Sequence, residues 1–337
     1  MRTIKIKGRE IGPGCPVYVI AEIGINHNGQ VELAKEMVAA AWENGADAVK
    51  IQTFITKRFL HPSHPGYQYD IDAEIPHDRE AEIWEFARKR GINLFSTPEE
   101  FESLEFIRRQ DPAVIKIAAM DFNFKKLVQK AAGIGKPLIL SSGMCTLEEV
   151  LRTARWVEEA GNREYAVLHC VSCYPTPPQA CNLKAIRTMQ AALDCPVGFS
   201  DHTVGVHIPL AAAVLGASII EKHFTIDKNL PGPDQKSSMD PGELRALTKA
   251  LRDIESAIGH GRKEPAPEEQ APRLFKRRGV YAAHDLQAEV ILKEEDVLFF
   301  APSAPDSCVT DWPMMEGRKL ARAVAAMTRI SRNDLRS

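Results

Sequence analysis

Short apolar runs alternate with longer amphipathic segments along most of the chain. The apolar runs have the length of buried strands and lie at residues 18–23, 48–53, 93–96, 114–117, 137–140, 166–170, 197–200 and 218–224. Segments of helical period lie between them at 31–44, 78–90, 98–110, 124–132, 147–160, 183–193 and 206–215, and another follows at 241–258. Eight such alternations over roughly 250 residues predict a (β/α)8 (TIM) barrel, an α/β fold.

A doubly wound open sheet is the competing fold. It would usually carry a glycine-rich phosphate turn after its first strand. The turn here reads Gly24-Ile-Asn-His-Asn-Gly, which does not match G-x-G-x-x-G, so the barrel is favoured. Apolar and basic residues alternate at 3–6, which predicts a short strand ahead of the barrel that covers its bottom.

The pattern changes after residue 258, and we divide the chain there. Residues 1–258 are expected to form the catalytic barrel, and 259–276, rich in Gly, Pro, Glu and Lys, an exposed linker. Residues 277–337 predict a small β-rich domain with short strands at 280–283, 297–300 and 319–323. About sixty residues form a marginal core alone, so this domain is expected to lean on the barrel or on a second subunit.

Composition and charge narrow the class of partner. The 337 residues carry a net charge of -2, which gives no general attraction to nucleic acid or to anionic membranes, and neither is expected as a partner. Runs of 18 or more apolar residues and the apolar core of a signal peptide are both missing from the sequence. The seven cysteines are scattered, as expected of reduced thiols, so a cytoplasmic protein is predicted.

Two histidines follow consecutive predicted strands. His202 ends the seventh and His223 the eighth, and both ends point to the same rim of a parallel barrel. With Asp201, Glu221 and Asp234 nearby, the pair suits a divalent metal ion. A single histidine at a strand end would more simply be a hydrogen-bonding group, but the matched pair favours a metal site.

Two lysines lie inside apolar strands and require an anionic partner when buried. Lys50 and Lys116 could form ion pairs inside the barrel, for example with Glu22, or could bind a substrate carboxylate or phosphate. The hydroxyl groups at neighbouring strand ends favour the substrate anion. Either lysine could instead form a Schiff base, as in a metal-free aldolase. The residues alone therefore indicate carbon–carbon bond formation or cleavage on an anionic substrate.

Nine ordered motifs resemble the sialic acid (N-acetylneuraminate) synthase family. They are AEIGINHNG (21–29), VKIQT (49–53), FSTP (95–98), IKIA (115–118), LSSGM (140–144), LHCVSCYPTP (168–177), GFSDHT (198–203), EKHFT (221–225) and PGPD (231–234). The resemblance implies a transferase of sialic acid biosynthesis that condenses phosphoenolpyruvate with N-acetylmannosamine or a related hexose and releases phosphate. It also implies that the C-terminal module is an antifreeze-like (SAF) domain within a domain-swapped homodimer.

The same resemblance assigns roles to individual residues. His202 and His223 would hold Mn²⁺ or Mg²⁺, and this cation would bind the aldehyde oxygen of the open-chain sugar. The phosphoenolpyruvate would contact Lys50, Thr97, Lys116, Ser141, Ser172, Ser200 and Arg273. The sugar would be oriented by Glu22, Gln52, Tyr174 and Asp234.

Three departures from the family leave the acceptor sugar open. The family usually has serine at Ala119 and glutamate at Asp121, which is still expected at the substrate. Its SAF domain offers an arginine where this chain reads Phe299-Phe300-Ala301-Pro302. A diacetamido or unacetylated hexose is therefore expected as a better acceptor than N-acetylmannosamine. The alternatives are a legionaminic, pseudaminic or deaminated acid synthase, a relative that acts on a phosphorylated sugar, and a catalytically silent carbohydrate-binding protein.

Overall fold

A closed parallel barrel forms the larger part of the structure, a computed structural model that describes residues 2–336. The strands follow the order β10-β3-β4-β5-β6-β7-β8-β9 around it. Their bounds are β3 Tyr18–Gly24, β4 Ala48–Thr53, β5 Leu94–Pro98, β6 Ile115–Ile117, β7 Leu138–Ser141, β8 Tyr165–Cys170, β9 Val197–Asp201 and β10 Ile219–His223. Every neighbouring pair is parallel, which confirms the predicted (β/α)8 barrel.

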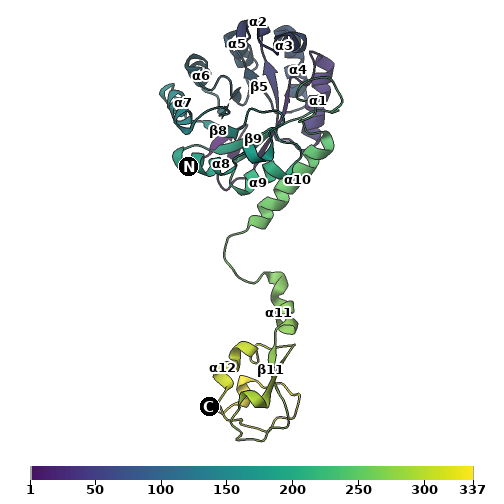
Figure 1. Cartoon of the computed structure of the whole chain (residues 1–337), viewed down its shortest axis with the longest axis vertical. Coiled ribbons are helices and arrows are strands. Elements are labelled where there is room, and N and C mark those ends of the chain that lie inside the picture. Colours follow the sequence, from purple (N-terminus) through teal and green to yellow (C-terminus); the bar gives the residue numbers. More distant parts are fainter. Residues whose placement is uncertain (1, 337) are drawn as a thin grey trace. The chain divides into compact units, whose positions relative to one another are not determined.

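Helices surround the barrel, as Figure 1 shows. They are α1 Val31–Glu43, α4 His77–Lys89, α5 Phe101–Arg109, α6 Lys125–Ala132, α7 Leu147–Glu159, α8 Lys184–Ala192, α9 His207–Val214 and α10 Pro241–Ile258, with one 3₁₀ turn at Pro178–Ala180. Helix α5 begins later than the predicted residue 98, because Pro98 still belongs to β5. The Glu100 carboxylate then accepts hydrogen bonds from the backbone N–H groups of Glu102 and Ser103, which fixes the start of the helix.

The lower half of the barrel interior is apolar. Alternate strand residues face inward, and one buried cluster contains Tyr18, Ile20, Ala48, Phe95, Val114, Ile139, Ala166, Leu168 and Ile219. The strands β1 Ile4–Ile6 and β2 Arg9–Ile11 pair as an antiparallel hairpin. Three of its isoleucines belong to the same cluster, so the hairpin closes the bottom of the barrel, as predicted. The polar upper half is thereby left open at the opposite rim.

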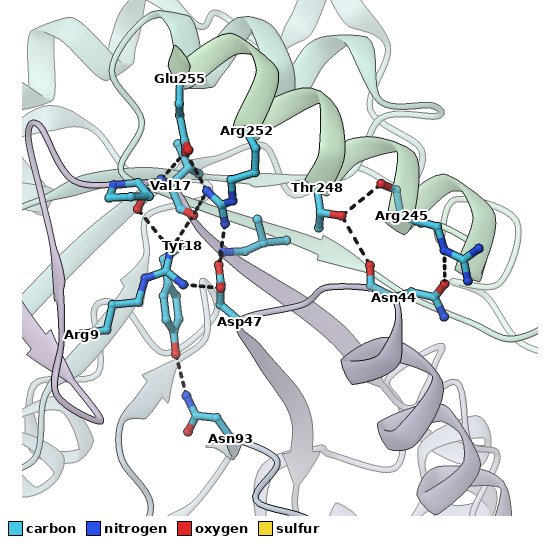
Figure 2. Close-up of polar contacts among 12 residues, drawn as sticks. Arg9, Val17, Tyr18, Asn44, Asp47, Asn93, Arg245, Thr248, Arg252 and Glu255 are labelled. Carbon is cyan, nitrogen blue, oxygen red and sulfur yellow. Dashed lines mark hydrogen bonds and ion pairs between the residues drawn. The ribbon is translucent and has the colours of Figure 1, made fainter.

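Polar contacts fix this closed bottom (Figure 2). The Asp47 carboxylate pairs with Arg9 from the hairpin and accepts a hydrogen bond from Arg252 of α10 at 3.2 Å. Glu255, also on α10, accepts hydrogen bonds from the Val17 backbone N–H at 2.6 Å and from Arg252 at 2.7 Å. These contacts hold the hairpin and the last barrel helix against the amino-terminal ends of the strands.

The segment after β4 folds into two short helices that the hydrophobic pattern did not predict. They are α2 Thr56–Phe59 and α3 Tyr67–Ala73. A small apolar cluster holds them, formed by Ile25, Phe54 and Ala73 with Phe59 and Tyr69 against it. Gly29 packs beneath α3 with a φ of +72°, and a Cβ atom there would lie 2.6 Å from the Asp72 carbonyl oxygen.

The chain from His260 onward forms a second compact unit. Its elements are α11 Gln270–Lys276, β11 Gly279–Ala282, β12 Val297–Phe300 and α12 Trp312–Met315, with 3₁₀ turns at Pro267–Glu269, Glu294–Asp296, Val309–Asp311 and Arg332–Asp334. Strands β11 and β12 pair antiparallel around a separate apolar core, which confirms a small β-rich region.

Two details of this unit differ from the sequence pattern. Helix α11 lies inside the segment expected to be a linker, and its Leu274 carbonyl accepts a hydrogen bond from the Ser303 N–H at 2.9 Å. The strand predicted at 319–323 is wrong, because Lys319 and Leu320 make only isolated bridges, with Ile291 and Leu335. Across residues 2–336, no helix is both long and apolar enough to span a membrane.

Candidate active site

A small cavity of about 60 Å³ lies at the carboxyl-terminal ends of the barrel strands. Ten of the predicted site residues line it, namely Glu22, Lys50, Gln52, Thr97, Lys116, Ser141, Tyr174, Ser200, His202 and His223. The remaining lining residues are Ala118, Ala119, Cys170 and Glu221. These side chains come from all eight strands or from the loops after them, and those on the strands stand above the apolar cluster.

Both buried lysines have internal partners. Lys50 pairs with Glu22 and donates a hydrogen bond to the Thr97 hydroxyl at 3.1 Å. Lys116 pairs with Glu221 at 2.7 Å. The side chains of both lysines are 3% exposed, so these ion pairs lie in a region of low dielectric constant. The ion-pair partners that the sequence left open are therefore two glutamates within the barrel.

The charges of this cluster are strongly coupled. Burial lowers the pKa of Lys50 to about 7, with Lys116 adding to the effect and Glu221 opposing it. Burial alone would raise the pKa of Glu221, but Lys116 and Lys50 more than offset it and lower the value to about 2. Glu221 is therefore ionised near neutral pH, and the pKa of Lys50 lies in that range.

The two predicted metal ligands lie side by side. The ring centroids of His202 and His223 are 5.4 Å apart. The Nδ1 atom of His202 bonds to the Val171 carbonyl oxygen at 2.8 Å, which leaves its Nε2 free. Burial lowers the pKa of His202 to about 4 and that of His223 to about 3, so both rings are neutral at pH 7. Neutral imidazole is the form that coordinates metal ions.

The carboxylates expected beside these histidines are arranged differently. Asp201 accepts a hydrogen bond from the buried Lys222 at 2.6 Å, and Glu221 Oε1 accepts one from Lys116 at 2.7 Å. The Glu221 Oε2 atom has no hydrogen-bond partner among the described residues, and the Asp234 Oδ2 atom lies 3.7 Å from His223 Nδ1. No group of three or more His, Cys, Asp or Glu that could hold a metal ion occurs within residues 2–336. The donors present fit a cation bound by two imidazoles that takes its other ligands from substrate and water.

A second cavity of about 270 Å³ adjoins the first and shares Gln52, Ala118, Ala119 and Tyr174 with it. Its other lining residues are Phe54, Phe59, Asp70, Glu99, Met120, Met144 and Ser172. Ser172 thus lies at this outer cavity rather than at the inner one. The Tyr174 ring stands between the two, with its centroid 4.1 Å from that of His202.

Glu99 is a site residue that sequence reasoning missed. It directly follows β5 and hydrogen-bonds to the predicted site residue Asp121. Burial raises the pKa of Glu99 well above its usual range, and repulsion from Asp121 adds to this; burial also raises the pKa of Asp121 to about 6. The two carboxyl groups therefore share one proton near neutral pH. The available signal was its place three residues past the strand predicted at 93–96, although it falls inside the helix predicted at 98–110.

Arg273 is the predicted site residue outside the barrel. It lies on α11 of the second unit, so its role at the substrate phosphate stays a prediction.

Comparisons with known proteins show the family to which this chain belongs. The model of the NeuB family matches residues 37–263. The N,N'-diacetyllegionaminic acid synthase of Legionella pneumophila is 37% identical over 317 residues, which cover 88% of this chain and 89% of that protein. The pseudaminic acid synthase of Campylobacter jejuni is 36% identical over 301 residues, covering 85% of this chain and 88% of that one.

A solved structure extends the likeness to three dimensions. The crystal structure of the N-acetylneuraminic acid (sialic acid) synthetase of Leptospira borgpetersenii, in complex with citrate, matches with a TM-score of 0.76 at 33% identity. The match covers 80% of this chain and 95% of that one. The family resemblance drawn from the motifs is thus confirmed.

Proposed function

We propose, because this chain belongs to the NeuB family of sugar acid synthases, that it condenses phosphoenolpyruvate with N-acetylmannosamine or a related hexose to give a nonulosonic (sialic-type) acid. The observation that carries the proposal is one cavity at the strand ends lined by two buried lysines and two neutral imidazoles. An anion and an electrophilic sugar can be held within reach of each other there.

The lysines and hydroxyl groups of the inner cavity are proposed to bind phosphoenolpyruvate. Lys50 and Lys116 would turn from Glu22 and Glu221 toward the substrate carboxylate and phosphate, which offer equivalent charge-assisted hydrogen bonds. The Ser141 hydroxyl is buried without a hydrogen-bond partner among the described residues, so it has a donor to offer a substrate oxygen. Thr97, Ser172 and Ser200 would add hydroxyl contacts, and Arg273 a positive charge.

His202 and His223 would hold a divalent cation, Mn²⁺ or Mg²⁺. Such a cation, when bound, supplies Lewis-acid polarisation of a carbonyl oxygen. Glu22, Gln52, Tyr174 and Asp234 would orient the open-chain sugar so that its aldehyde carbon faces the methylene carbon of phosphoenolpyruvate. A bond forms between these two carbons, water adds at the carbon that carries the phosphate, and cleavage of its C–O bond releases inorganic phosphate.

The second unit completes the proposal. We propose that it is an antifreeze-like (SAF) domain and that two chains exchange these domains in a homodimer. Light scattering after gel filtration would then give twice the 37.4 kDa mass of the chain. A monomer over the working concentration range would contradict the exchange.

Phosphate release tests the function directly. It should require both phosphoenolpyruvate and a sugar, stop in EDTA and return with Mn²⁺. His202→Ala should abolish it and should also weaken Mn²⁺ binding, measured by electron paramagnetic resonance. His284→Ala is the matched control, because that side chain is 57% exposed on the second unit. Full activity of the His202 variant would remove the histidine pair from the mechanism, and phosphate release without any sugar would exclude a condensation.

A further inference from the structure

The outer cavity contains more carboxyl groups than the chain neutralises. Glu99 and Asp70 line it, and Asp121 bonds to Glu99. Glu99 and Asp121 are 7% and 8% exposed. Apart from the proton that the two carboxyl groups share, no donor among the described residues reaches Glu99 Oε2 or Asp121 Oδ2. A buried carboxylate without a cation or a donor is costly, so this arrangement indicates that a ligand supplies one.

The nearby lysines have ion-pair partners of their own. Lys50 and Lys116 pair with Glu22 and Glu221, and their charges offset only part of the rise in the pKa of Glu99. The Glu99–Asp121 pair holds one shared proton and therefore carries about one negative charge. Half-buried Asp70 adds a third carboxyl group at the same cavity. The outer cavity is thus acidic, in contrast to the balanced charges of the inner one.

We propose that the outer cavity binds a protonated, unacylated amino group of the acceptor sugar, and that Glu99 selects it. This inference rests on the proposed synthase function, because it names the class of acceptor as an amino-hexose. An ammonium group offers three donors and a positive charge, which match two carboxyl groups that share one proton. N-acetylation would remove that charge and leave the carboxyl groups without a counter-ion.

The walls of the cavity strengthen such a contact. Phe54 and Phe59 line it with the acidic groups, and these apolar side chains lower the local dielectric constant. The cavities of about 60 and 270 Å³ together reach the lower end of the roughly 300 to 1,000 Å³ that is typical of small-molecule sites. A sugar can therefore extend from the inner cavity, where its aldehyde reacts, into the outer one.

A panel of sugars tests the selection. Phosphate release from phosphoenolpyruvate is measured with mannose, with three amino-deoxymannoses that carry the amine at C2, C4 or C6, and with their N-acetylated counterparts. We expect kcat/KM for at least one free amine to exceed that of its N-acetylated counterpart and of mannose by about tenfold. Preference for the N-acetylated sugar at all three positions would overturn the inference.

Variants of Glu99 assign the preference to this residue. Glu99→Gln should remove it by raising the KM of the amino sugar about tenfold, with the KM of phosphoenolpyruvate unchanged. Glu99→Asp keeps the charge and should retain part of the preference. Glu105→Gln is the control, because that carboxylate pairs with Arg108 on the surface of α5. An unchanged preference in Glu99→Gln would refute the role of Glu99.

Calorimetric binding separates this inference from the proposed function. If no sugar supports phosphate release, the synthase proposal fails, and binding of the amino sugars in the presence of phosphoenolpyruvate judges the outer cavity alone. Tighter binding of an amine to the unmodified protein than to Glu99→Gln would support the acidic subsite, and equal binding would overturn it. Circular dichroism shows whether the two Glu99 variants fold. If neither folds, the sugar preference of the unmodified protein decides whether the outer cavity selects a free amine.

Discussion

Replacement of Glu221 by glutamine removes the negative partner of a buried lysine without changing the shape of the side chain. Glu221 accepts a hydrogen bond from Lys116 at 2.7 Å and lies 3.9 Å from Lys50. Its side chain is 5% exposed, and that of Lys116 is 3% exposed. Breaking a buried ion pair on one side typically costs about 3–5 kcal/mol, because the other charge stays buried without compensation.

Deprotonation of Lys116 sets a similar upper limit on this cost. The folded variant can avoid a buried charge by releasing the Lys116 proton. Releasing a proton at pH 7 from a lysine with an ordinary pKa of about 10.4 costs roughly 5 kcal/mol. We therefore expect the free energy of unfolding of the barrel to fall by about 3–5 kcal/mol in Glu221→Gln at pH 7. Urea unfolding followed by far-ultraviolet circular dichroism measures this loss.

The pH dependence distinguishes this cause from a general packing defect. In the variant, the folded state binds fewer protons than the unfolded chain until the pH reaches the unfolded lysine pKa of about 10.4. The loss in the free energy of unfolding of Glu221→Gln should therefore shrink by up to about 1.4 kcal/mol for each pH unit above 7.

The control for this variant is Glu85→Gln, which breaks a surface pair with Lys89 whose side chains are 59% and 70% exposed. It should change stability by less than about 1 kcal/mol. A deficit below about 1 kcal/mol for Glu221→Gln, or one that is independent of pH, would refute the reasoning.

Two further variants test a buried carboxyl group and a tightly packed glycine. Burial raises the pKa of Glu80 from 4.5 to about 7, so the folded protein should lose roughly 3 kcal/mol of stability as the pH rises from 4.5 to 7 and then level off. Glu80→Gln should abolish this loss in urea unfolding at pH 5 and 8, and an unchanged slope would contradict it. Gly198→Ala would place a Cβ 2.5 Å from Leu168 Cδ2 and 2.7 Å from the Ile219 carbonyl, and should cost about 1–3 kcal/mol in thermal unfolding. Gly133→Ala, whose nearest contact is at 3.4 Å, should be nearly neutral, and equal effects of the two would argue against overpacking.

The barrel could be predicted because its evidence is local. The period of the apolar positions separates strands from helices, and alternation along a strand places residues such as Ile20 and Glu22 on the same inner face. Helices α2 and α3 escaped prediction because they are only four and seven residues long, too short for a clear helical period. A small apolar cluster, not their own periodicity, holds them in place.

The candidate site was predictable as a set of residues but not as a set of contacts. Parallel strands that point one way bring their end residues to a common rim, so the histidine pair and the lysines could be placed there from the sequence. Asp201 was expected beside that pair, yet it bonds to Lys222. Glu99 was overlooked because it lies where the pattern already indicated a helix.

The order of strands and helices and the polar character of the open rim follow from the amino-acid sequence, because each depends on residues a few positions apart. Which charged groups form ion pairs with one another was decided only by closure of the barrel. Lys116 and Glu221 are separated by 105 positions, and they meet because strand tilt and stagger set which inward positions share a level. The same closure joins the Glu99–Asp121 pair across two strand ends, and no local pattern records that contact.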